Sequence, residues 1–172
     1  MQLVLTEDQE LLAKTASDFV RTHSPIKRAR ALRDTRDPMG FSRDLWKRMA
    51  DLGWVGILIP EEYGGAGMGL ADLTVVLEAL GRVLAPEPFL STVLLAGQGL
   101  TLVGSEEQKC TWLPAIATGE KILTVAYQEA RSRYDVNRVT TRAERAGTAW
   151  RRRSARRRRR SGRPPRRRGA GP

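Results

Sequence analysis

The stretch GWVGILIPEEYGGAGMG, residues 53–69, decides the fold because it joins a run of large apolar residues to a loop crowded with glycine. Residues 53–60 show no helical period and end at Pro60, so we expect a buried, extended segment that crosses the core. Four glycines within residues 64–69 predict a loop whose backbone turns sharply or approaches another group closely. That loop is a candidate binding site, and an ordinary structural turn is the alternative interpretation.

Helical patterns precede this stretch. A capping box between Thr6 and Gln9 predicts a helix start, and Ser24-Pro25 predicts its end. A second, more polar helix is expected over residues 26–33, and Ser42 is expected to cap a third helix. The apolar face of this third helix consists of Leu45, Trp46, Met49 and Leu52, with Gly53 at its left-handed end.

Helical patterns also follow the stretch. An apolar stripe predicts a helix that ends before Pro86, and residues 89–102 predict another helix, both largely buried. The pattern SEEQ at residues 105–108 repeats the capping box and begins a helix that ends at Gly119. The apolar stripe consists of Leu73, Val76, Leu77, Leu80 and Leu84.

The pattern changes after the last of these helices. Residues 122–127 are rich in β-branched side chains, and residues 139–145 alternate in the manner of a strand. We therefore expect a mainly α protein: a helical domain over residues 1–120, the start of an incomplete β domain over residues 121–150, and a tail over residues 151–172.

The positive charge is concentrated in that tail. Of the 30 Lys and Arg residues, 12 arginines lie in residues 151–172, which contain no Asp or Glu, leaving 18 basic against 19 acidic groups elsewhere. The tail has no aliphatic residue larger than Ala, so we expect it to be disordered. It is either an arm that binds nucleic acid phosphates or, as we favour, an out-of-frame translation of a GC-rich gene. Codons for Arg, Gly, Ala, Pro and Ser are rich in G and C, and the tail has no lysine.

Several classes of protein are excluded by composition. With one cysteine, Cys110, and one histidine, His23, the chain has no means to form an intrachain disulfide or a Cys/His metal site. The first residues lack the basic and apolar regions of a signal peptide. No apolar run approaches the roughly 20 residues that span a bilayer. We expect a cytoplasmic protein without a membrane span or a metal.

Four blocks of residues resemble the acyl-CoA dehydrogenase family in order and spacing. Together they cover residues 3 to about 146. Within the family, residues 78–82 and 128–135 are most similar to the small subunit of pimeloyl-CoA dehydrogenases and other bacterial enzymes built from two unlike subunits. The four blocks consist of residues 6–12 (TEDQELL), 52–65 (LGWVGILIPEEYGG), 104–120 (GSEEQK, LP and GE), and 126–144 (AYQE, DV and RAE).

This resemblance implies an amino-terminal helical domain, a central β-barrel and a carboxy-terminal helical bundle, with FAD between the last two. It also implies α,β-desaturation of an acyl-CoA thioester, in which a carboxylate takes the α-proton while the β-hydrogen leaves as hydride to flavin N5. The family's catalytic glutamate lies in the carboxy-terminal domain. We therefore assign no catalytic residue here and expect a truncated chain that is inactive alone.

The resemblance implies cofactor contacts near the end of the matched region. Tyr127 and Gln128 correspond to the strand that faces the pyrimidine edge of the flavin, where Gln128 replaces the family's Thr. Arg133 and Tyr134 replace a Gly-Ser pair that contacts flavin and the pantetheine arm of CoA. Two bulky side chains in place of a bare backbone turn alter that contact.

The resemblance also implies substrate contacts and partners. Tyr63, Gly64 and Gly65 belong to the loop beside the acyl end of the substrate pocket. The expected partners are the acyl-CoA substrate, electron-transfer flavoprotein, and other dehydrogenase subunits in a homo- or hetero-oligomer. Two alternatives are a non-enzymatic module whose basic tail binds nucleic acid, and a helical partner of another dehydrogenase subunit.

Overall fold

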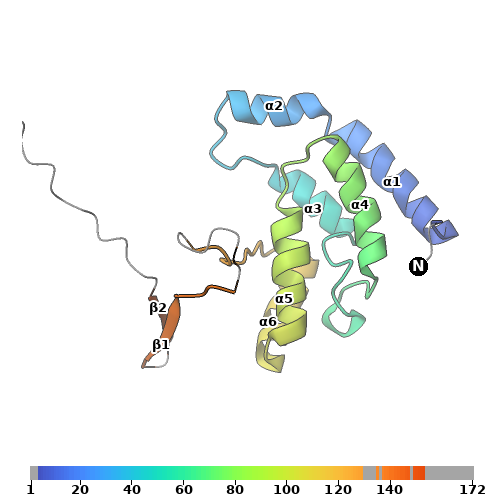
Figure 1. The fold of residues 1–172 in the computed structure, drawn as a ribbon. Coiled ribbons are helices and arrows are strands. Elements are labelled where there is room, and N and C mark those ends of the chain that lie inside the picture. Colours follow the sequence, from blue (N-terminus) through green and yellow to red (C-terminus); the bar gives the residue numbers. More distant parts are fainter. Residues whose placement is uncertain (1–3, 130–134, 136, 148, 154–172) are drawn as a thin grey trace, which may run out of the picture. The chain divides into compact units, whose positions relative to one another are not determined.

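The computed structural model of the chain describes residues 4–129, 135, 137–147 and 149–153. The chain divides into two compact units, Met1–Val125 and Ala126–Pro172. The first unit is helical, and Figure 1 shows α1 beside α4 and α5 beside α6. Its elements are α1 (Glu7–His23), α2 (Ile26–Asp34), α3 (Arg43–Asp51), the 3₁₀ turn η1 (Glu61–Tyr63), α4 (Leu70–Arg82), the π-helix η2 (Leu90–Gly97), α5 (Gln98–Val103) and α6 (Glu106–Ala117).

Both predicted capping boxes are confirmed. The Thr6 hydroxyl accepts a hydrogen bond from the Gln9 amide at 3.2 Å, and the Gln9 side chain accepts one from the Thr6 amide, also at 3.2 Å. The box that begins α6 has the same form. Gln9 also donates to Asp72 at 2.9 Å, and Asp72 in turn accepts from the Gly69 amide at 2.9 Å. The first turns of α1 and α4 are therefore joined by hydrogen bonds.

The core of the first unit lies between α1, α3, α4 and α6 and the segment after α3. The indole N–H of Trp46 donates to the Gly119 carbonyl at 3.0 Å, which satisfies a polar group inside the core. The largest fully buried side chains of the core are Trp46, Met49, Ile57, Ile59, Leu73, Leu113 and Ile116.

A buried ion pair joins α2 to the turn before η2. One guanidinium nitrogen of Arg28 donates to both carboxylate oxygens of Glu87, at 2.9 and 2.8 Å, and to the Ser24 hydroxyl at 2.9 Å. The Ser42 amide also donates to Glu87 at 3.3 Å. The side chain of Glu87 is 0% exposed and that of Arg28 is 21% exposed. Since α2 has no buried residue of its own, this pair is an important attachment for that helix.

Residues 54–59 are buried as predicted, with Gly53 exposed and Pro60 half-buried, but the prediction of an extended segment is wrong. Their backbone forms consecutive tight turns, with the Ile57 amide bonded to the Trp54 carbonyl at 3.3 Å and the Ile59 amide to the Gly56 carbonyl at 3.0 Å. The described residues of this unit contain no strand that could pair with the segment. Turns satisfy the Ile57 and Ile59 amides locally, and the amides of the glycine-rich loop satisfy carbonyls of the segment, with Met68 donating to Ile57 and Gly67 to Ile59, both at 2.8 Å.

Three expectations about apolar faces also need correction. Leu52 and Leu84 were expected on buried helix faces but are 45% and 64% exposed. Because α3 ends at Asp51 and α4 ends at Arg82, each leucine follows the end of its helix and no longer lies on the buried face. Residues 89–102 form no single α-helix, because η2 precedes α5. One side of that element is also open, since Leu102 is 75% exposed.

The regular structure among the described residues of the second unit is an antiparallel hairpin of β1 (Arg142–Ala146) and β2 (Ala149–Arg153). Ala146 pairs with Ala149, and Gly147 in the turn has a φ of +65°. The predicted strand over residues 122–127 forms no ladder with any described residue. β2 includes residues 151–153, which composition assigned to the tail, whereas residues 154–172 lie outside the described part.

The predicted mainly α fold, followed by the first strands of a β domain, is confirmed. Within the described residues, no helix combines the length and apolar character that crossing a membrane requires.

Candidate functional site

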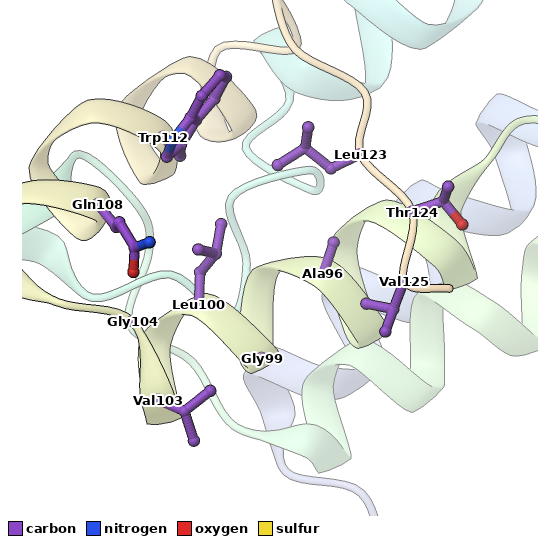
Figure 2. Close-up of a pocket in the computed structure, with 10 residues that line it drawn as sticks. All are labelled: Ala96, Gly99, Leu100, Val103, Gly104, Gln108, Trp112, Leu123, Thr124 and Val125. Atoms are coloured by element: carbon purple, nitrogen blue, oxygen red, sulfur yellow. The ribbon is translucent and has the colours of Figure 1, made fainter. Parts of the chain in front are cut away.

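An apolar cavity of about 400 Å³ lies beside α5 in the first unit. Figure 2 shows that α6 and the extended segment after it face this cavity together with η2 and α5. No titratable side chain is among the described residues that line it, and Gln108 and Thr124 supply its polar side chains. The cavity therefore suits an apolar group and offers no acid or base. The lining consists of Ala96, Gly99, Leu100, Val103, Gly104, Gln108, Trp112, Leu123, Thr124 and Val125.

Two hydrogen bonds hold the walls of this cavity. The hydroxyl of Thr92, a fully buried residue of η2, donates to the Leu123 carbonyl at 2.9 Å and fixes the extended wall. The Gln98 side chain donates to the Leu58 carbonyl at 3.3 Å and fixes α5 to the buried turns. A Cβ atom placed on Gly99 would meet no atom within 4 Å, so the absent side chain leaves part of the space open.

Sequence reasoning missed this cavity. Ala96, Gly99, Leu100 and Val103 follow the i, i+3, i+4, i+7 spacing of one helix face, which the sequence displays. The spacing alone does not tell whether another element covers that face. The structure leaves it open to the cavity, and Val103 is 86% exposed.

The three residues predicted to contact the substrate have different surroundings in the structure. Gly64 ends η1 with a φ of +79°, and a Cβ atom on Gly65 would lie 2.0 Å from the Ile59 carbonyl oxygen, so only glycine fits there. The Tyr63 hydroxyl instead donates to the Glu106 carboxylate at 2.8 Å. This hydrogen bond to Glu106 raises the pKa of Tyr63 to about 12.

The two glycines, but not Tyr63, line a second cavity of about 330 Å³. Its charged wall is formed by Lys47 and Asp51, which pair at 3.0 Å. Gly64 and Gly65 therefore line the same cavity, whereas the Tyr63 side chain is hydrogen-bonded to Glu106 of α6.

Two of the predicted cofactor residues are described. Tyr127 and Gln128 are exposed and extended, and their backbone amides and carbonyls make no hydrogen bond to any described residue. An exposed row of unpaired backbone donors and acceptors fits the polar edge of a flavin ring. The predicted contacts Arg133 and Tyr134 lie outside the described residues.

Comparison with known proteins identifies the family. The sequence profile described as acyl-CoA dehydrogenase, N-terminal domain matches residues 6–120. The chain belongs to the acyl-CoA dehydrogenase family. The resemblance stated from the sequence blocks is confirmed.

Relatives within the family are substantially longer than this chain. Acyl-CoA dehydrogenase IpdE2 of Mycolicibacterium smegmatis is 39% identical over 124 residues, which are 72% of this chain and 38% of that protein. The ChsE4-ChsE5 complex from Mycobacterium tuberculosis matches with a TM-score of 0.74 and 30% identity, over 88% of this chain and 40% of that chain. An acyl-CoA dehydrogenase from Bacillus anthracis, solved with FAD, matches with a TM-score of 0.69 and 29% identity, over 81% of this chain and 24% of that chain.

Proposed function

We propose that the chain forms the helical acyl-binding part of an FAD-dependent acyl-CoA dehydrogenase, whose reaction is α,β-desaturation of an acyl-CoA thioester. The apolar cavity beside α5 is the observation that carries this proposal. Its lining suits a hydrocarbon chain, and each methylene group buried there contributes about 0.8 kcal/mol of binding free energy. Val125, which lines the cavity, is separated by one residue from Tyr127, where the flavin contact is expected.

The flavin contact is proposed for the extended residues that follow the cavity wall. The free backbone groups of Tyr127 and Gln128 hold and orient the polar ring edge, and the Gln128 amide adds a hydrogen-bond donor. Arg133 and Tyr134 remain proposed contacts on the same grounds of resemblance. When bound, FAD supplies the acceptor for the hydride that leaves the β-carbon.

We further propose that these 172 residues alone do not catalyse the reaction. No carboxylate is among the described residues that line the apolar cavity, and family resemblance places the base in a carboxy-terminal domain. The test is to purify the chain, record its visible flavin absorbance and assay a medium-chain acyl-CoA with an artificial electron acceptor. We expect no flavin retained through purification and no turnover. Stoichiometric co-purified flavin or measurable desaturation would overturn the proposal, whereas weak, reversible binding of FAD supplied in excess would not.

A second candidate function is that of a helical partner to another dehydrogenase subunit. It is favoured by apolar side chains at the cavity mouth, where Val103 is largely exposed and Trp112 is partly exposed. The ChsE4-ChsE5 relative is itself a complex of two proteins. Co-expression with a large dehydrogenase subunit encoded nearby should give a stable complex that Val103→Asp weakens. An unchanged elution volume on co-expression would remove this candidate.

For residues 151–172 we propose translation out of frame, on the grounds of their composition. The parent DNA should be read in the other two frames beyond codon 150. We expect one frame to continue into further strands and a helical bundle with a glutamate base. If neither frame does so, the out-of-frame origin is wrong and a nucleic-acid arm becomes the leading explanation.

A further inference from the structure

One carboxylate organises the described part of the second unit. Glu129 Oε1 accepts hydrogen bonds from the Thr140 amide at 3.0 Å and the Thr141 amide at 2.7 Å. Glu129 Oε2 accepts from the Thr140 amide at 3.0 Å and from the Thr140 hydroxyl. Among the described residues, donors of Thr140 and Thr141 thus converge on one side chain, which joins the residue after Gln128 to the residue before β1.

The chemistry of this cluster is that of a fixed carboxylate. Donors from Thr140, and then from Thr141, stabilise the charged form and lower the pKa of Glu129 to about 2. Hydrogen bonds to an ionised acceptor are stronger than those between neutral groups. The hairpin that follows has only five residues in each strand, and an isolated hairpin of this kind is marginal in water. The carboxylate therefore provides order that the hairpin does not provide for itself.

We propose that Glu129 is a positioning residue for flavin binding, because its carboxylate fixes the direction in which the backbone of Tyr127 and Gln128 continues toward β1. This inference rests on the proposed function, in which those two residues meet the flavin edge. Glu129 itself need not touch the cofactor. Its effect passes through the main chain of the adjacent residue, whose free donors and acceptors must keep a fixed direction to match a planar ring.

The test uses tryptic cleavage of the full chain. Trypsin cuts after arginine, and Arg131, Arg133 and Arg138 lie in the sequence between Glu129 and its hydrogen-bond partner Thr140. The variants are Glu129→Gln, which keeps the shape and removes the charge, and Thr140→Val, which removes one hydroxyl. Glu120→Gln, an exposed glutamate earlier in the same chain, is the matched control. Without flavin, Glu129→Gln should be cut at these sites about three- to tenfold faster, Thr140→Val by less, and Glu120→Gln at the rate of the unaltered chain.

The same digestion is repeated with excess free FAD. We expect FAD to slow cleavage of the unaltered chain and of Glu120→Gln at least twofold, and to have no effect on Glu129→Gln. If all chains are cleaved at equal rates without FAD, the inference is wrong, whatever effect FAD has on cleavage. Faster cleavage of Glu129→Gln without any FAD protection of the unaltered chain means that the carboxylate orders the segment but the flavin proposal is wrong. Equal FAD protection of Glu129→Gln and the unaltered chain also overturns the positioning role.

Discussion

The helical unit and the hairpin unit are ordered by different forces. In the helical unit, large side chains such as Trp46, Met49 and Ile116 are withdrawn from water almost completely. In the hairpin unit, every residue of β1 is exposed, and the carboxylate of Glu129 supplies a cluster of hydrogen bonds. Burial of apolar area is cooperative and insensitive to the charge state of one group, whereas the Glu129 cluster depends on a single ionisation. The two units should therefore respond to different perturbations.

The largest expected effect is loss of core packing in the helical unit. Trp46→Ala removes a buried indole and leaves the Gly119 carbonyl without its donor, so the free energy of unfolding should fall by about 3–5 kcal/mol. Urea unfolding followed by far-UV circular dichroism measures this. Trp112→Ala, at the cavity mouth, is the control and should change stability much less. Similar losses for both variants would show that the assigned core is incorrect.

Breaking the buried ion pair should come next. Arg28→Ala leaves the carboxylate of Glu87 buried without its cation, which costs about 3–5 kcal/mol when a pair is fully buried and less here, because Arg28 is partly exposed. The double variant Arg28→Met, Glu87→Leu should recover most of the lost stability, since no charge is then buried. Thermal unfolding of the two variants provides the measurement. A double variant as unstable as the single one would contradict this account.

Two glycine-to-alanine substitutions, one at a closely packed position and one facing open space, should change the free energy of unfolding in opposite directions. Gly65→Ala forces a methyl group against the Ile59 carbonyl and should destabilise the helical unit by about 1–3 kcal/mol. Gly99→Ala places the same methyl group in open space within α5 and should stabilise it by up to about 1 kcal/mol. Parallel urea titrations compare the two. The same sign for both variants would mean that the cavity wall at Gly99 is closed.

The smallest effect on stability is expected for the hairpin unit, and its signature is pH dependence. The pKa of Glu129 falls from 4.5 to about 2, so its stabilising contribution is fully present above pH 4.5 and is lost as the pH falls through about 2. The amide proton shifts of Thr140 and Thr141 in NMR spectra should titrate together with a midpoint near 2. In Thr140→Val the midpoint should move toward 4.5. A midpoint near 4.5 in the unaltered chain would rule out the cluster.

The sequence predicted the parts of this molecule that depend on neighbours along the chain. The capping boxes at Thr6 and Ser105 and the left-handed glycine at position 53 involve residues within four positions of each other, so local pattern was sufficient. The tight turns of residues 53–60 were mistaken for an extended segment because an apolar run shows burial without showing which partners its backbone has.

The candidate sites were predicted less completely for the same reason. The apolar cavity is formed by four segments whose lining residues lie up to 29 positions apart in the sequence, and no pattern shows that they leave space between them. The hydrogen bonds of Glu129 reach Thr140, eleven positions away, and Glu-to-Thr contacts at that separation have no sequence signature. The family resemblance predicted Tyr127 and Gln128 as flavin contacts, whereas the hydrogen-bonded carboxylate of Glu129 beside them was found in the structure.

The hydrogen bond from Gln9 to Asp72 limits where insertions and deletions can occur in the chain. It joins residues 63 positions apart and makes the start of each helix depend on the register of the other. An insertion or deletion of one residue near either helix start removes both sets of capping contacts at once. Length variation among close homologues should therefore be absent near Thr6 and Gly69 and should accumulate in the exposed turn between α2 and α3.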